Sequence, residues 1–186
     1  MENNDRAAGD TYSVVRIDNA LVPQMAELEL RCFSDPWSEK ELADSVASPF
    51  YCFFAAMDGE RMLGYAGVLM TPPEAQIVSI CVEPSMRRRG IARALLRVLL
   101  QTAASAGAEV ALLEVREHNA GAIALYESEH FSCVGTRKNY YRNPTENALL
   151  YLLELRSKEY VRDLPAGNER NDAPAGAFSD VLHDTV

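Results

Sequence analysis

Residues 77–92 decide the fold, because they join an apolar segment to a basic turn that contains glycine. The apolar segment is Ile77-Val78-Ser79-Ile80-Cys81-Val82, and the basic turn is Arg87-Arg88-Arg89-Gly90-Ile91-Ala92. The first has the composition of a strand, and the apolar spacing after Gly90 is typical of a helix. Amides at the start of a helix have no partner within the helix, and the helix dipole favours an anion there. The order strand, turn, helix therefore predicts a site for a pyrophosphate-bearing cofactor.

The residue types in the turn fit this interpretation without matching the commonest phosphate loops. Glycine lets the backbone approach a ligand closely, and arginine adds planar, permanently charged groups. The patterns G-x-x-x-x-G-K-[ST] and G-x-G-x-x-G are both absent from the sequence, which excludes a P-loop and a dinucleotide fingerprint. An ordinary basic loop at a helix entrance would look the same. The motif R-x-x-G-x-A by itself therefore leaves both interpretations open.

Composition bounds the class of protein. The chain has 186 residues, of which 48% are hydrophobic and 24% charged, and its net charge is −9. These values predict one soluble globular domain and argue against a general nucleic-acid binder. The N-terminus is polar without a signal peptide, and arginines interrupt the most apolar helix candidate, so we expect a cytoplasmic protein with no membrane partner.

Four cysteines are scattered along the chain, and no Cys-x-x-Cys pair occurs. The histidines are not at ligand spacing to them, so the sequence predicts no metal site. We interpret the cysteines as small buried hydrophobic residues in a reducing compartment. They are Cys32, Cys52, Cys81 and Cys133.

Hydrophobic periodicity and turn signals predict strands and helices in a definite order. Strands are expected at 12–17, 51–57, 61–70, 76–82, 110–115, 131–136 (with 141 as an outer limit) and 148–155, and helices at 23–32, 38–48, 91–107 and 119–128. A capping box at Ser38-Glu39-Lys40-Glu41 starts the second helix, and Asp58-Gly59 signals a hairpin. Hairpins together with crossover helices predict an α/β (α+β) domain with a mixed sheet. We expect a flexible leader at 1–11, one domain at 12–156 and a disordered tail at 157–186.

Glu114 is a candidate general base, because it interrupts the apolar run of residues 110–115. A buried acid is costly unless it is paired or functional, and burial moves a carboxyl group toward a useful basicity. The alternatives are an ion pair with Arg116 or a solvent-facing position at the end of a strand. The sequence alone leaves these alternatives open.

Tyr126 is a candidate general acid, because a tyrosine hydroxyl holds its proton at neutral pH and can protonate a leaving thiolate. It lies twelve residues after Glu114 in a predicted helix. On that helix it shares a face with Ile123, so packing in the core is the alternative.

The chain resembles the GNAT-fold N-acetyltransferases, and within them the RimI-type ribosomal-protein alanine N-acetyltransferases. The matching segments are Pro36-Trp37-Ser38-Glu39-Lys40, Arg87 to Leu96, Leu113-Glu114-Val115-Arg116, Asn119, Ala122 to Ser128, and Arg137-Lys138-Asn139-Tyr140-Tyr141. The basic turn is common to all GNAT proteins, whereas the later segments are more typical of the RimI type. The resemblance covers roughly residues 12–155 and implies a mostly antiparallel central sheet of about seven strands flanked by four helices.

This resemblance implies acetyl-CoA as the acetyl donor and gives roles to particular residues. The backbone of Ile80, Cys81 and Val82 would bind the pantetheine arm as an added strand. The pyrophosphate would lie in the turn that comprises Arg87, Arg88, Arg89, Gly90, Ile91, Ala92 and Arg93. Asn119 would contact the cofactor near its thioester, Glu114 would be the base and Tyr126 the acid.

The implied reaction is acetyl transfer to the N-terminal α-amine of a ribosomal protein that begins with alanine. Trp37, Tyr140 and Tyr141 are candidates for the acceptor groove, although Trp37 is equally explained as a core anchor. Acetylation of lysine or small amines is an alternative that demands a stronger base, because the pKa of lysine is about 10.4. A non-catalytic acetyl-CoA-binding module is a second alternative, against which the pair Glu114 and Tyr126 argues.

The sequence departs from the family pattern at three places. Arg87 replaces a common glutamine and Ala92 a common glycine, and both leave Gly90 in place. In Glu129-His130-Phe131 the family commonly has Leu-Gly-Phe, so His130 replaces a glycine where a left-handed helix end is expected.

Overall fold

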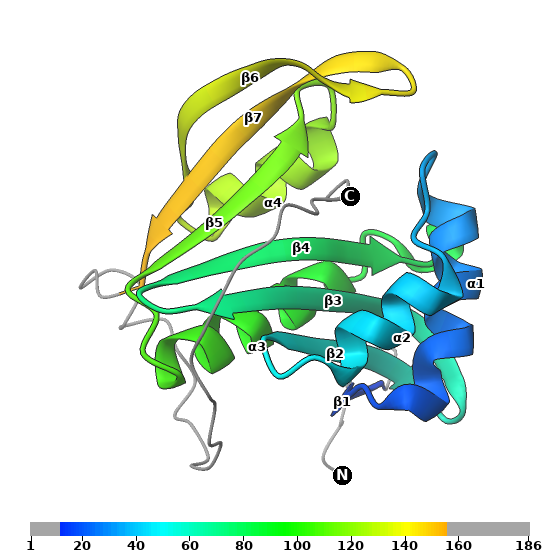
Figure 1. Cartoon of the computed structure of the whole chain (residues 1–186). Helices are drawn as coiled ribbons and strands as arrows, with labels where there is room; N and C mark the ends of the chain where they lie inside the picture. The colour runs from blue at the N-terminus through cyan, green and yellow to red at the C-terminus, as the bar shows by residue number, and fades with distance from the viewer. Residues whose placement is uncertain (1–11, 156–186) are drawn as a thin grey trace, which may run out of the picture.

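A computed structural model describes residues 12–155 (Figure 1). The predicted leader at 1–11 and tail at 157–186 lie outside the described residues. The elements in chain order are β1 (Ser13–Arg16), α1 (Val22–Cys32), α2 (Glu39–Ala47), β2 (Tyr51–Asp58), β3 (Arg61–Thr71), β4 (Glu74–Val82), α3 (Ile91–Ser105), β5 (Val110–Arg116), α4 (Ala120–Ser128), β6 (Ser132–Arg142) and β7 (Thr145–Glu154). Short 3-10 turns at Asn19–Leu21 and Pro84–Met86 complete the set.

The strands form one seven-stranded sheet in the order β1-β2-β3-β4-β5-β7-β6. The pair β4–β5 is parallel and the other five pairs are antiparallel. The parallel pair requires a crossover, and α3 supplies it. The expected mixed, mostly antiparallel sheet with four helices is therefore confirmed. The chief difference is at β6 and β7, which are longer than the periodicity indicated and close a long hairpin.

Local sequence explains where several elements begin and end. The Ser38 hydroxyl accepts the Glu41 amide at 3.3 Å while the Glu41 carboxylate accepts the Ser38 amide at 2.8 Å, so α2 begins with a complete capping box. Gly59, at φ +57°, makes the turn between β2 and β3. Gly107, at φ +89°, follows α3 in the left-handed conformation that usually ends a helix.

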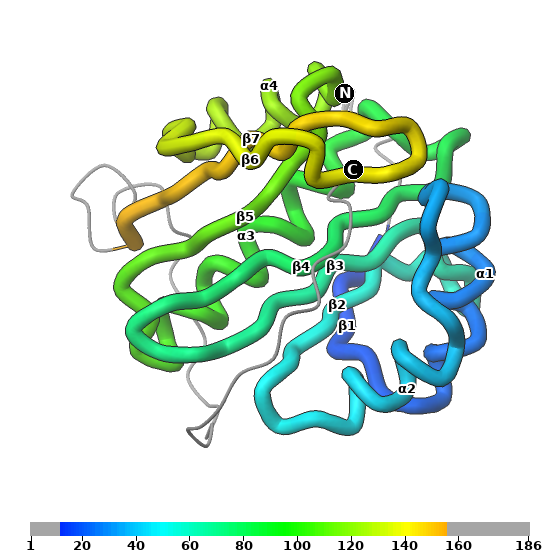
Figure 2. Tube along the Cα trace, turned by 45° about the horizontal axis from the view of Figure 1, so that its top comes forward, coloured from blue at the N-terminus to red at the C-terminus, as the bar shows by residue number. Residues whose placement is uncertain are grey.

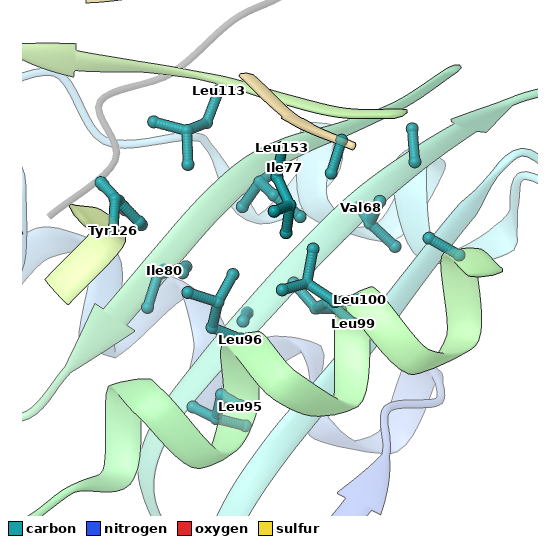
Figure 3. Packing of buried hydrophobic residues seen from close by; sticks show 14 of the residues in the cluster. Val68, Ile77, Ile80, Leu95, Leu96, Leu99, Leu100, Leu113, Tyr126 and Leu153 are labelled. Carbon is teal, nitrogen blue, oxygen red and sulfur yellow. The ribbon is translucent and has the colours of Figure 1, made fainter. Parts of the chain in front are cut away.

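Two hydrophobic clusters hold the sheet. The first lies between α3 and the sheet, extends to α4, and includes residues of both β4 and β5 (Figure 3). Its centre is the fully buried face of α3 with Leu95, Leu96 and Leu99. The second cluster lies on the opposite face, where α1 and α2 cover β2, β3 and β4. Strands β2 to β4 are thus covered on both faces.

The sheet divides into two arms between β4 and β5. We call β1 to β4 the N-terminal arm and β5 to β7 the C-terminal arm. The two arms pair only through residues 74–76 of β4 and 110–112 of β5. Beyond these pairs the strands diverge, as Figures 1 and 2 show from two directions. The edge of β4 after Gln76 is therefore not paired with β5, and backbone groups of this edge can bind an extended ligand.

The cysteines differ in their surroundings. Cys52 and Cys81 are buried, Cys32 is half-buried and Cys133 is exposed. The expectation of four buried cysteines is therefore wrong for Cys133, because β6 is an edge strand with mostly exposed residues. No helix between residues 12 and 155 is long and apolar enough to cross a membrane.

Candidate active site

A cavity of about 380 Å³ lies where β4 ends and α3 begins. Its volume is in the usual range for small-molecule sites. Its walls come from the end of β4, the basic turn, the first turn of α3 and the start of α4. The lining residues are Ile80, Val82, Met86, Arg87, Arg88, Gly90, Ile91, Ala92, Arg93, Asn119, Gly121, Ala122, Ala124 and Leu125.

Most residues predicted for the cofactor line this cavity, and two do not. Arg89 and Cys81 are absent from the lining. The backbone direction explains Cys81. The Glu83 amide donates to Leu63 of β3, and neighbouring residues alternate in direction, so Val82 and Ile80 face away from β3 whereas Cys81 faces toward it. The free edge of β4 thus presents the amide and carbonyl of Ile80 and the amide of Val82, whose carbonyl accepts from Arg87.

The basic turn has a backbone suited to holding an anion. Arg88 and Gly90 are in the left-handed region at φ +65° and +81°, and no atom lies within 4 Å of the position that a Cβ of Gly90 would take. The first hydrogen bond of α3 runs from the Ala94 amide to the Gly90 carbonyl at 3.0 Å. The amides of residues 91–93 therefore come before the first intrahelical bond, at the positive end of the helix dipole.

The arginines of this region differ in what their side chains contact. Arg87 donates from Nε to the Val82 carbonyl at 3.1 Å, which fixes the turn against β4. Arg93 pairs with Glu129 at 3.0 Å and donates to Ser128 at 2.9 Å. Arg97 binds the same Glu129 carboxylate through two hydrogen bonds of 2.8 and 3.0 Å. Glu129 is 5% exposed, so this buried carboxylate fastens α3 to the end of α4.

Asn119 lies at the start of α4 and also lines the cavity. Its side-chain oxygen accepts the Ala122 amide at 3.1 Å, which caps the helix. The cap fixes the start of α4, and Tyr126 lies further along the same helix.

Glu114 lies in the part of β5 that has diverged from β4. It is 5% exposed, and its Oε1 forms an ion pair with Arg137 of β6 at 2.9 Å. Tyr140 also hydrogen-bonds Glu114, and burial followed by this contact raises the pKa of Tyr140 well above its ordinary value. The Arg137 guanidinium lies 5.5 Å from the centre of the Tyr140 ring. Arg116, which the sequence offered as an alternative partner, contacts the carbonyls of the β6–β7 turn.

Tyr126 and Glu114 lie on opposite faces of β5. Leu113 and Val115 belong to the same core cluster as Tyr126, and side chains alternate along a strand, so Glu114 faces the other way. Tyr126 is fully buried and packs edge-on against Phe131. Neither residue is among those that line the cavity, so the structure places the two candidate groups on either side of β5 rather than together.

The three aromatic residues predicted for an acceptor groove lie in three environments. Trp37 is 4% exposed in the cluster under α1 and α2, where its amide donates to the buried Glu29 at 2.9 Å. Tyr140 is half-buried beside Glu114. Tyr141 is buried, and the Arg116 guanidinium stacks 4.2 Å from the centre of its ring. Of the three, Tyr140 contacts the candidate base.

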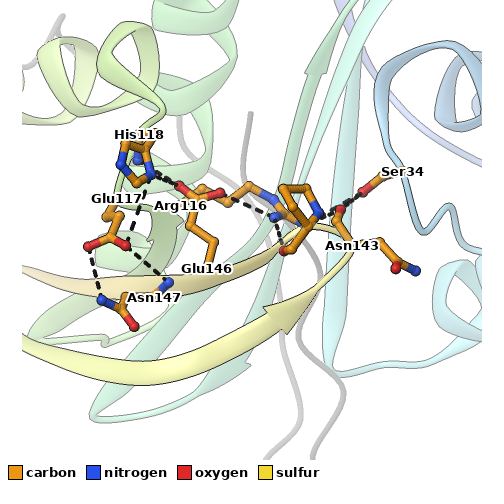
Figure 4. A network of polar contacts seen from close by, with 8 residues as sticks. Ser34, Arg116, Glu117, His118, Asn143, Glu146 and Asn147 are labelled. Atoms are coloured by element: carbon orange, nitrogen blue, oxygen red, sulfur yellow. Dashed lines mark hydrogen bonds and ion pairs between the residues drawn. The ribbon is translucent and has the colours of Figure 1, made fainter.

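Arg116 connects segments that are distant in the sequence (Figure 4). It donates to the carbonyls of Asn143 and Pro144 in the β6–β7 turn at 3.3 and 3.2 Å, and it pairs with Glu146 at 3.3 Å. The Ser34 hydroxyl, from the loop between α1 and α2, donates to the same Asn143 carbonyl at 2.9 Å. The two loops that border the divergence of the arms are therefore joined.

Sequence reasoning missed three of these groups: Arg137 as the partner of Glu114, Glu129 as the partner of two arginines, and Arg116 as the support of the turn. The polar pair Glu129-His130, where the family commonly has Leu-Gly, was a usable signal for Glu129. His130 is at φ +69°, so it keeps the left-handed geometry that a glycine would provide there.

Comparisons with known proteins agree with this architecture. The model of the acetyltransferase (GNAT) family matches residues 22–131. N-alpha-acetyltransferase RimI of Mycobacterium tuberculosis is 42% identical over 139 residues, which are 72% of this chain and 86% of that protein. The [ribosomal protein bS18]-alanine N-acetyltransferase of Escherichia coli K12 is 33% identical over 147 residues, which are 77% of this chain and 97% of that protein.

Solved structures show the same fold. The crystal structure of the ribosomal-protein-S18-alanine N-acetyltransferase from Escherichia coli superimposes with a TM-score of 0.73 at 32% identity and covers 78% of this chain and 94% of that chain. Arabidopsis thaliana NAA60, crystallised in complex with acetyl-CoA, shares the fold with a TM-score of 0.73 at 18% identity and covers 79% and 100% of the two chains. The family match, the two relatives and the divergent β4–β5 pair agree, and this chain belongs to the GNAT family of acetyltransferases.

Proposed function

We propose that this protein transfers the acetyl group of acetyl-CoA to the N-terminal α-amine of a ribosomal protein that begins with alanine. The observation that carries the proposal is the buried Glu114, held by Arg137 and Tyr140 at the opening between the arms. The relative from Escherichia coli, named for acetylation of an alanine of ribosomal protein bS18, supports this choice of acceptor. A ribosomal-protein substrate would place the reaction in the cytoplasm.

The residues around the cavity fit acetyl-CoA. The space over Gly90 and the amides of residues 91–93 suit a pyrophosphate, and Arg88 adds charge at the cavity wall. The free edge of β4 at Ile80 and Val82 suits the amides of the pantetheine arm, which would pair with it as a strand does. When bound, acetyl-CoA supplies an activated acetyl thioester.

The chain's own groups would then move protons on either side of the opening. An α-amino group has a pKa of about 7.7–8.0, so Glu114, directly or through a water, need only accept one readily lost proton. The Val82 amide lies on the free edge of β4 and would donate to negative charge on the carbonyl oxygen. The Tyr126 hydroxyl would donate its proton to the departing sulfur.

A direct test uses the purified full chain, acetyl-CoA and a panel of peptides read by mass spectrometry. Each peptide carries one internal lysine and begins with alanine or another residue, and a matched set has a blocked N-terminus. We expect a gain of one acetyl group on the first residue of the alanine peptides and none on the blocked set.

Two results would contradict the proposal in different ways. Acetylation of the internal lysine in the blocked peptides would indicate a lysine acetyltransferase, and an alkaline pH optimum would accompany it because lysine must first be deprotonated. Binding of acetyl-CoA by calorimetry, without transfer to any peptide or small amine, would indicate a non-catalytic binding module.

A further inference from the structure

Two cysteines from different elements meet behind the free edge of β4. Cys32 is the last residue of α1, and Cys81 is the penultimate residue of β4. The Cys32 thiol donates to the Val82 carbonyl at 3.6 Å, and the Cys81 thiol donates to the Leu28 carbonyl at 3.8 Å. Since Val82 follows Cys81 and Leu28 is one helical turn before Cys32, each thiol reaches the immediate surroundings of the other.

The two thiols differ in reactivity. The neighbouring Cys81 thiol, helped by the nearby Arg87 guanidinium, lowers the pKa of Cys32 to about 7, although partial burial and Glu83 act in the opposite direction. Burial raises the pKa of the Cys81 thiol, which is fully enclosed. Cys32 is half-buried, so small reagents can reach it. A thiolate is the reactive form of cysteine, and Cys32 is therefore the attacking sulfur of the pair.

The other two cysteines lack this combination. Cys52 is buried, and burial raises the pKa of its thiol. Cys133 is exposed on β6, and its thiol donates to the Gly135 carbonyl at 3.5 Å. Both serve as internal references for any modification of Cys32.

We propose that Cys32 and Cys81 are an oxidation site of this protein, at which a peroxide closes a disulfide between α1 and β4 and thereby slows acetyl transfer. The thiolate sulfur of Cys32 attacks one peroxide oxygen and the O–O bond breaks, which gives a sulfenic acid and a hydroxide that takes a proton from solvent as the first water. The Cys81 sulfur then attacks the Cys32 sulfur, the S–S bond forms, and the S–O bond breaks. The leaving hydroxide takes the Cys81 proton as a second water. The two thiols supply the two electrons that reduce the peroxide.

Closure of this bond changes the edge that borders the cavity. A disulfide requires an S–S distance of about 2.05 Å, so both sulfur atoms must leave the carbonyl groups that they contact, Val82 for Cys32 and Leu28 for Cys81. Cys32 also loses the proton that it donates to Val82, which lines the cavity. Displacements of this order near reacting groups are costly in rate. The effect on acetyl transfer, unlike the oxidation itself, rests on the proposed function.

Mass spectrometry of the full chain tests the oxidation. The folded protein is treated with one equivalent of hydrogen peroxide, remaining thiols are alkylated, and the digest is analysed without reduction. We expect a peptide pair joined through Cys32 and Cys81, with Cys52 and Cys133 alkylated. In Cys81→Ala a sulfenic acid on Cys32, trapped with a dimedone reagent, should replace the disulfide. Oxidation of Cys133 while Cys32 stays reduced, or absence of the joined peptides, would overturn the proposal.

Acetyl transfer to the N-terminal alanine peptide tests the consequence. We expect oxidised wild type to lose activity by about 10-fold or more and to regain it with dithiothreitol. Cys32→Ser retains a hydroxyl donor toward Val82, so it should match the untreated wild type and stay unchanged after peroxide. A fully active disulfide form would refute the control of activity. If untreated protein transfers nothing, the proposed function fails, while the joined peptides still decide whether the oxidation site exists.

Discussion

Strands β4 and β5 are neighbours in the sheet, yet their surroundings differ. The N-terminal arm, which contains β4, is covered on both faces by α1, α2 and α3, and its contacts are mainly apolar. The C-terminal arm is covered by α4 on one face, and most residues of β6 at its edge are exposed. Its distinctive contacts are polar, with Arg137 on Glu114 and Arg116 on the β6–β7 turn.

The two arms therefore hold their functional groups in different ways. The free edge of β4 that would bind the cofactor is fixed by packing of its own arm, which tolerates little change because protein interiors are close-packed. The candidate base is fixed by an ion pair and by hydrogen bonds, which depend on charge and orientation more than on volume. Substitutions in the two arms should therefore affect different measurements.

The largest effect is expected for Glu114→Gln. This change keeps the shape of the side chain and removes the proton acceptor, so kcat for peptide acetylation should fall by roughly 10²- to 10⁴-fold. Binding of acetyl-CoA, measured by calorimetry, should be unchanged. Glu154→Gln, which alters an exposed carboxylate at the end of β7, is the control. A variant at position 114 with wild-type kcat would end the assignment of Glu114 as the base.

Tyr126→Phe should reduce kcat on the order of 10²-fold without loss of acetyl-CoA affinity, because only the hydroxyl is removed. Tyr151→Phe is a matched control, since Tyr151 is also buried and its ring lies 6.4 Å from that of Tyr126. If both variants turn over at the same rate, the hydroxyl of Tyr126 has no special part in the reaction and the residue is a core anchor.

Leu96→Ala tests the apolar support of the N-terminal arm. Leu96 is fully buried in α3, so its truncation should lower the free energy of unfolding by about 2–5 kcal/mol. Leu30→Ala, at a position that is 72% exposed on α1, should change it by no more than about 0.5 kcal/mol. Urea titration followed by circular dichroism measures both. If the two variants had the same free energy of unfolding, α3 would contribute less to the core than its burial indicates.

Arg116→Lys should have the smallest effect on peptide acetylation. Lysine keeps the positive charge but lacks the two guanidinium nitrogens that donate to the Asn143 and Pro144 carbonyls. Loss of one or two hydrogen bonds to the turn corresponds to about 1–2 kcal/mol, so KM for the peptide should rise by about 10-fold while KM for acetyl-CoA and kcat stay nearly constant. Arg142→Lys in the same hairpin is the control. An increase in KM for acetyl-CoA alone would contradict a role on the acceptor side.

The contrast between the arms also explains what the sequence could predict. The helices and most strand positions followed from spacing between near neighbours, and the basic turn after Val82 followed from residues within sixteen positions. Apolar periodicity predicts these features because burial of a face depends on local spacing.

The polar contacts could not be predicted in the same way. Glu114 and Arg137 are on strands separated by β7, and Glu129 meets Arg97 across 32 positions. Such pairs depend on which strands become neighbours, and composition does not reveal this. The expectation that Arg93 wraps the pyrophosphate likewise did not include its ion pair with the buried Glu129.

The three residue pairs that join β4 to β5 have a mechanical consequence. Beyond these pairs the two arms share no ladder hydrogen bonds. A change in their separation would therefore break no further strand pairing. The far end is bridged by side chains instead, through Ser34 and Arg116 on the Asn143 carbonyl. Backbone pairing thus fixes the two arms where they join, and a few side-chain hydrogen bonds set the separation between the arms at the opposite end.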